Sequence, residues 1–163
     1  MELKKLLDAI AALTALMQTL LAVLERETSE MGVVNIDAMA DSNREKEDLI
    51  EKIAVQEQLM KQAITGLIHR EGLPADTSFG TLATSLAQRG DRELFNKRLE
   101  LKSSAHKIQQ VAVLNREIAE KFSSTVATTL TLITRLANQS NVYGSSGGYQ
   151  QPRNGAVMIN MEA

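Results

Sequence analysis

The chain has two histidines, His69 and His106, which are its side chains best suited to general acid–base catalysis or to zinc binding. Neither has a glutamate three residues before it or a second histidine four residues away, so the metal-binding spacings found on helices are missing. Without any cysteine, the chain has no thiol nucleophile, disulfide or thiolate metal site. We therefore expect both histidines at the surface and no catalytic, metal or cofactor site.

Gly144, Gly147 and Gly148 form a second group that could serve chemistry, because glycine-rich loops hold phosphates in nucleotide-binding proteins. No strand is predicted before them, and the chain contains neither a Walker loop nor a Gly-x-Ser-x-Gly elbow. We interpret this group as part of a flexible linker. The sequence favours a protein that is not an enzyme.

Asn115 is a polar residue in an otherwise apolar row of a long predicted helix. A lone asparagine in such a row commonly fixes the register of packed helices by finding a buried hydrogen-bond partner. We favour this role for Asn115, and a ligand contact is the alternative.

That long helix is predicted over residues 91–138, which contain no proline and no glycine. Two series of positions at seven-residue spacing indicate the contact face. We expect one series at Leu94, Leu101, Ile108, Asn115, Phe122, Thr129 and Leu136, and the other at Arg98, Ala105, Ala112, Ala119, Val126 and Ile133. The three alanines predict that a neighbouring helix approaches closely.

Three further helices are predicted before it. Residues 2–31 carry leucines at helical spacing, and Gly32 gives a stop. Residues 36–70 follow, with Asn35 or Asp37 as the cap and with a polar first half that we expect to be well solvated or frayed. A short helix is predicted over residues 78–88, and Asp91 caps the long one. The apolar side of the second helix is expected at Met39, Ile50, Ile53, Met60, Ile64 and Leu67.

The connections between these helices are short, which favours antiparallel neighbours. The fold class is therefore all-α: an elongated antiparallel bundle of three long helices plus one short helix. We expect the bundle domain to cover residues 1–138 and a flexible tail rich in Gly, Ser and Gln to cover residues 139–163. The tail ends in an apolar segment with too few large side chains to fold by itself.

The composition of the chain argues against nucleic acid and membrane as partners. A net charge of -2 and 3% aromatic residues argue against nucleic acid, which requires a basic surface or stacking side chains. Residues 9–24 carry no charge, but this run is shorter than the roughly 20 residues that span a bilayer. We expect no membrane insertion and a cytoplasmic location, with which the absence of cysteine is consistent.

Several motifs together resemble the FlgN family of flagellar export chaperones. Asn35-Ile36-Asp37, Glu45-Lys46 and Leu49-Ile50 are similar to the start of the family's second helix, and Leu114-Asn115 lies where its long helix carries an asparagine. Tyr143-Gly144 followed by Gly147 or Gly148 resembles the Tyr-Gly-x-x-Gly element after that helix, and residues 157–159 resemble the apolar close of the tail. The family usually has Asn-Gly in the long helix, whereas here Arg116 follows Asn115.

The resemblance implies a function and two binding regions. It implies an escort for hook-associated proteins of the FlgK and FlgL type, which delivers them to the export gate protein FlhA. Tyr143 and Gly144 are nominated for docking at FlhA. For the amphipathic C-terminal region of the client, we expect a helix-in-groove contact. Its candidate residues are Val126, Leu130, Ile133 and Leu136 on the long helix and Val157, Met158, Ile159 and Met161 in the tail.

Two alternatives remain at this point. One is a structural or adaptor coiled coil that oligomerises through the same apolar rows, and weak self-association is compatible with either function. The other is a different class of flagellar export chaperone, similar to FliT or FliS, because these helical proteins share composition.

Overall fold

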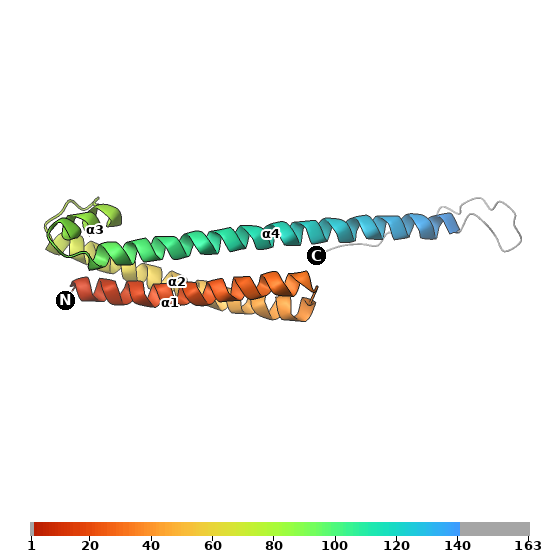
Figure 1. The fold of residues 1–163 in the computed structure, drawn as a ribbon, viewed down its shortest axis with the longest axis horizontal. Helices are drawn as coiled ribbons and strands as arrows, with labels where there is room; N and C mark the ends of the chain where they lie inside the picture. Colours follow the sequence, from red (N-terminus) through yellow and green to blue (C-terminus); the bar gives the residue numbers. More distant parts are fainter. Residues whose placement is uncertain (1, 141–163) are drawn as a thin grey trace, which may run out of the picture. The chain divides into compact units, whose positions relative to one another are not determined.

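A computed structural model of the protein describes residues 2–140, which form four α-helices and no strand. They are α1 (Glu2–Gly32), α2 (Ile36–Arg70), α3 (Phe79–Gln88) and α4 (Glu93–Ser140), coloured along the chain in Figure 1. The predicted all-α class, with three long helices and one short one, is confirmed. The chain divides into two units, residues 1–119 and residues 120–163, and the described part of the second unit belongs to α4.

The starts of the helices agree with the caps that the sequence predicts. The side-chain oxygen of Asn35 accepts a hydrogen bond from the backbone N–H of Ala38 at 3.1 Å, and Ser78 accepts one from Thr81 at 3.1 Å. Asp91 accepts a hydrogen bond from the N–H of Glu93, the first residue of α4. Each cap satisfies an amide that would otherwise lack a partner in the first turn.

The first three helices end in the same pair of backbone hydrogen bonds, which is the Schellman motif. After α2 and α3, Gly72 and Gly90 take the left-handed position of this motif, with φ of 65° and 101°. After α1 the same position falls on Val34, with φ of 55°, rather than on the predicted stop residue Gly32. A β-branched side chain is strained in this conformation, so the turn from α1 to α2 carries a local cost.

Helices α1 and α2 form an antiparallel hairpin, as expected for helices joined by a short connection (Figure 1). The helical spacing expected for α1 is seen in the structure, where Ile10, Met17, Leu24 and Met31 are buried in one row. The main cluster of buried apolar side chains joins the start of α1, the end of α2, α3 and the start of α4. Its members are Leu6, Ile10, Ala63, Leu67, Ile68, Leu82, Ala83, Leu86 and Leu94.

Up to residue 119 the packed face of α4 differs from the prediction in one of its two rows, and beyond it the predicted positions of both rows are exposed. Ala105, Ala112 and Ala119 are exposed, so the expected close approach at these alanines is wrong. The side chains that are buried or half-buried along this part of α4 are Leu101, Ser104, Ile108, Val111, Asn115 and Ile118. The second row therefore follows the first by three residues instead of four, because Val111 and Ile118 remove more apolar surface from water than alanines would.

The contact face of α2 also differs from the prediction. Ile50 was expected on it but is 57% exposed, and its neighbour Leu49 is buried instead. The polar first half is well solvated, as expected, because most of its residues are exposed, but it is not frayed: Ser42 is fully buried, and Lys46 is half-buried in the same row. The reason is that both polar side chains have partners on α1, which are described in the next section.

Among the described residues, α1 is the one helix long and apolar enough to span a membrane by length and composition. Core helices of soluble proteins pass the same test. In this structure α1 packs against α2, and nine of its side chains are buried.

Candidate partner-binding face

A buried polar node joins α4 to α1. Asn115 is 5% exposed, and its side-chain amide donates hydrogen bonds to the backbone carbonyl of Leu24 at 2.8 Å and to the carboxylate of Glu27 at 2.9 Å. The hydroxyl of Thr28 donates to the amide oxygen of Asn115 at 2.5 Å. The predicted structural role of Asn115 is thereby confirmed, because it has buried partners that fix the register of two helices.

The same node extends to α2 through Glu27, whose side chain is 10% exposed. Its second carboxylate oxygen forms an ion pair with the ammonium of Lys46 at 2.5 Å, and the Lys46 side chain is 19% exposed. A buried carboxylate requires both charge neutralisation and hydrogen bonds, and Glu27 has both. One acidic residue of α1 therefore holds α2 on one side and α4 on the other.

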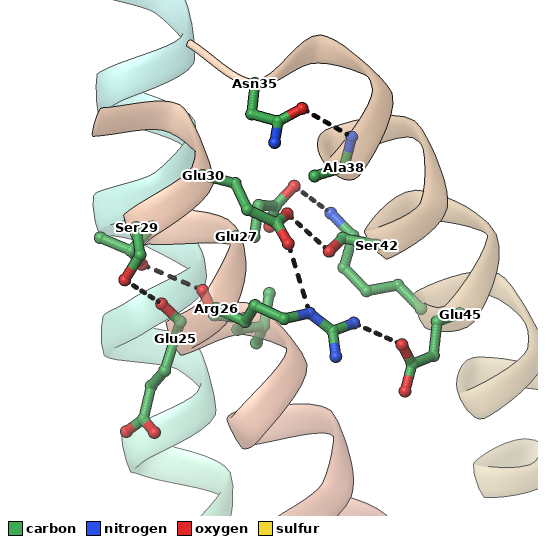
Figure 2. Close-up of polar contacts among 12 residues, drawn as sticks. Glu25, Arg26, Glu27, Ser29, Glu30, Asn35, Ala38, Ser42 and Glu45 are labelled. Atoms are coloured by element: carbon green, nitrogen blue, oxygen red, sulfur yellow. Dashed lines mark hydrogen bonds and ion pairs between the residues drawn. The ribbon is translucent and has the colours of Figure 1, made fainter. Parts of the chain in front are cut away.

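A second polar group lies nearer the turn between α1 and α2 (Figure 2). The hydroxyl of Ser42 donates to the carboxylate of Glu30 at 2.7 Å, and Arg26 lies between Glu30 and Glu45, forming ion pairs with both. The hydrogen bond with Glu45 raises the pKa of the Arg26 guanidinium. These contacts explain why the polar half of α2 stays helical against α1.

Within residues 1–119, the Asn115 hydrogen bonds set the register of α4 against α1. Asn115 lies level with residues 24–28, and α1 ends at Gly32, about one turn further on. By contrast, α4 continues to Ser140. The helix is 48 residues long, against 31 for α1.

The apolar row of α4 continues past residue 119, into the second unit. The spacing of three and four residues that buries Ile108, Val111, Asn115 and Ile118 continues along the helix. All of the following positions in that row are exposed: Phe122, Thr125, Thr129, Leu132 and Leu136. Within the second unit, α4 therefore presents an apolar face to solvent. Exposed apolar surface of this kind marks a site of protein binding.

The four candidate residues on this helix lie on or beside that face. The exposed fractions of Val126, Leu130, Ile133 and Leu136 are 41%, 51%, 55% and 57%. Sequence reasoning omitted two large apolar residues of the same face, Phe122 at 44% and Leu132 at 56%. The three-and-four spacing of the row would have included both. We call the set Phe122, Val126, Leu130, Leu132, Ile133 and Leu136 the apolar face of α4.

The remaining candidates, Tyr143, Gly144, Val157, Met158, Ile159 and Met161, lie outside the described residues. His69 and His106 are exposed, as expected. Within residues 2–140, no group of three or more His, Cys, Asp or Glu side chains is placed to hold a metal ion. The candidate residues in the described part are thus the exposed apolar side chains of α4.

The fold defines the class: an all-α protein whose described part has three long helices and one short one. Comparison with known families gives the particular family: residues 1–151 match the family model described as FlgN protein, and the chain belongs to this family. Its broad role is therefore that of a flagellar export chaperone. No curated protein and no solved structure matches the chain.

Proposed function

We propose that this protein is a cytoplasmic chaperone that binds the amphipathic C-terminal region of hook-associated proteins of the FlgK and FlgL type and delivers them to the export gate protein FlhA. Membership of the FlgN family supports an export chaperone, and the clients and the gate are our proposal. The observation that supports client binding most directly is the exposed apolar face of α4.

The proposed contact is a client helix that lies along α4 and covers this face. In residues 1–119 the same apolar row of α4 packs within the bundle, whereas from Phe122 to Leu136 it is exposed. An amphipathic client helix would supply the missing cover by inserting apolar side chains at the same spacing. Each square ångström of apolar surface removed from water would contribute roughly 25 cal/mol before the cost of association.

The tail completes the proposal. We propose that Val157, Met158, Ile159 and Met161 close over the bound client, because methionine side chains adapt to varied partner surfaces. Tyr143 and Gly144 are proposed to dock at FlhA, since a tyrosine ring can anchor in an apolar pocket of a partner. Both roles stay predictions.

Client binding is tested by titrating the protein with the C-terminal peptide of a FlgK-type client. Leu130→Lys places a charge on the apolar face and is expected to weaken binding at least tenfold. Thr131→Lys is the matched control, because the neighbouring position points away from that face and should leave the affinity within twofold. Equal binding by both variants would remove the apolar face from the proposal.

The tail is tested separately. Deleting residues 155–163 should weaken binding of the same peptide. An unchanged affinity would show that the tail takes no part in client binding. For docking, Tyr143→Ala should reduce recovery in a pull-down with the cytoplasmic domain of FlhA, and equal recovery would count against Tyr143.

The adaptor alternative is distinguished by oligomeric state, because a second copy could also cover the apolar face. Light scattering of the purified protein is expected to show a monomer or weak dimer. Circular dichroism should show a gain of helix when client peptide is added. A concentration-independent higher oligomer that ignores the peptide would favour the adaptor.

A further inference from the structure

The part of α4 that carries the apolar face has no charged residue for more than three turns. Lys121 and Arg135 flank the run, and residues 122–134 between them are uncharged. Every one of these residues is exposed, although the run is about 20 Å long at 1.5 Å per residue. An exposed helix without charges lacks both solvation by ionic groups and support from ion pairs at four-residue spacing.

The composition of this run is also poor for a helix. It contains five threonines, two serines, Phe122, Val126 and Ile133, all of which rank below Ala and Leu as helix formers. Each threonine hydroxyl donates to the backbone carbonyl four residues earlier, for example Thr128 to Ser124 and Thr131 to Ala127, at 2.9 Å. Such bonds offer the side chain a partner but slightly destabilise and bend the helix.

Residues 101–118 of the same helix are in a different situation. Half-buried Leu101, Ile108 and Ile118 line their contact row, and Asn115 ties them to Leu24 and Glu27 of α1. Most helical stability in proteins comes from such packing of an apolar face and not from intrinsic propensity. Residues 122–134 have the apolar face without the packing.

We infer that the helix over residues 122–134 is marginal in the unbound protein and becomes fully ordered when an uncharged, apolar face of a client helix covers it. This inference rests on the proposed client binding and specifies the chemistry of the client. A charged side chain facing this run would be desolvated with no opposite charge available from residues 122–134. The client helix therefore presents apolar or neutral side chains over about three turns.

Ordering on contact means that part of the binding free energy is used to complete the helix. The apparent affinity for the client then equals the affinity of a fully ordered face multiplied by the fraction of unbound molecules in which residues 122–134 are already helical. Stabilising the helix on its opposite side should accordingly tighten binding without adding a contact.

The unbound protein supplies the first test, by amide hydrogen exchange. Residues 122–134 are expected to exchange at least tenfold faster than residues 101–118. Equal protection of the two stretches would overturn the inference, whether or not any client binds.

The second test replaces three threonines that face away from the apolar face, as Thr128→Ala, Thr131→Ala and Thr134→Ala together. Alanine has the highest helix propensity, so helix content should rise and the client peptide should bind roughly threefold to tenfold more tightly. The matched control puts valine at the same positions, which removes the hydroxyls but keeps the β-branch, and should give no gain. Identical affinities of the alanine and valine variants would contradict ordering on contact.

The third test varies ionic strength. Because the run is uncharged, raising sodium chloride from about 0.05 M to about 0.5 M should change the peptide's affinity less than twofold. A steep loss of affinity would show that charges on the client face this surface, against the inference. A client peptide that does not bind the unaltered protein at all would instead refute the proposed function, and the exchange result would still decide the inference.

Discussion

Asn115 of α4 and Glu27 of α1 share a hydrogen bond of 2.9 Å in a part of the protein where both residues are less than a tenth exposed. The Asn115 amide also holds the backbone carbonyl of Leu24, so a slip of α4 by one turn would break every bond at this node. This relationship fixes the register of α4 against α1 within residues 1–119.

Replacing Asn115 with alanine should destabilise the protein by about 2 kcal/mol, because the Glu27 oxygen that accepts from Asn115 would be a buried acceptor without its donor, whereas the Leu24 carbonyl would still accept from the Thr28 hydroxyl. Urea unfolding followed by circular dichroism measures the change. Asn96→Ala is the control: this asparagine is exposed on the same helix, and its loss should stay within about 0.5 kcal/mol. Similar effects of the two substitutions would show that the node does not hold the helices together.

Two ion pairs of α2 are expected to differ sharply in how much they contribute to the free energy of unfolding. Lys46→Met removes the cation beside buried Glu27 and should cost about 3 kcal/mol, as is typical when a buried pair loses one partner. Lys52→Met breaks the pair with Asp48, whose side chains are 57% and 59% exposed, and should cost less than about 1 kcal/mol. The free energy of unfolding of both variants, measured under the same conditions, gives the comparison. If Lys46→Met lowers the free energy of unfolding no more than Lys52→Met does, solvent screens the charge of Glu27 as effectively as that of exposed Asp48.

The starts of the helices could be predicted from the sequence because their causes are local. Asn35 and Ser78 cap the turns that directly follow them, and Gly72 and Gly90 supply the left-handed residues that end α2 and α3. These arrangements involve residues only a few positions apart in the chain. The predicted end of α1 is less accurate, because the left-handed position falls on Val34, two residues after the expected stop residue Gly32.

The packed faces could be predicted only in part because they depend on residues distant in the sequence. Positions three and four residues from Leu101 both lie beside it on the helix, and the sequence did not decide between Ser104 and Ala105. The pairing of Glu27 with Lys46 likewise depends on the register of two separate helices. The same shift of one position explains why Leu132 was missing from the candidate site, whereas Phe122 already lies in the first predicted row.

The pKa of Glu71 gives a prediction about acid stability. A hydrogen bond from Arg70, with a further contribution from Arg89, lowers the pKa of this carboxyl below its ordinary value of 4.5. A lowered pKa in the folded state means that ionised Glu71 stabilises the protein above the ordinary pKa, and that this contribution is lost as the pH falls through the lowered value. Glu71→Gln should therefore reduce the melting temperature at pH 7, and the difference from the unaltered protein should shrink steadily below pH 4.5.

Glu57→Gln is the control for the acid series, because Glu57 is an exposed residue of α2, the helix that Glu71 caps, and makes no ion pair in the described part of the chain. Its melting temperature should follow that of the unaltered protein at every pH. If Glu71→Gln behaves in the same way, the contacts with Arg70 and Arg89 contribute nothing in solution.

The turn after α1 offers a substitution that should stabilise the protein. Val34 occupies the position that Gly72 and Gly90 occupy after α2 and α3, and its φ of 55° costs a β-branched residue about 1–2 kcal/mol. Val34 is also 47% exposed, so little packing is lost when its side chain is removed. Val34→Gly should raise the free energy of unfolding by about 1 kcal/mol and the melting temperature by roughly 2–4 °C.

Val33→Gly, one residue earlier and without a positive φ, should instead lower stability by a few tenths of a kcal/mol, because glycine there only adds freedom to the unfolded chain. The opposite signs of the two changes are the diagnostic result, and a loss of stability in both would mean that Val34 is not strained in solution.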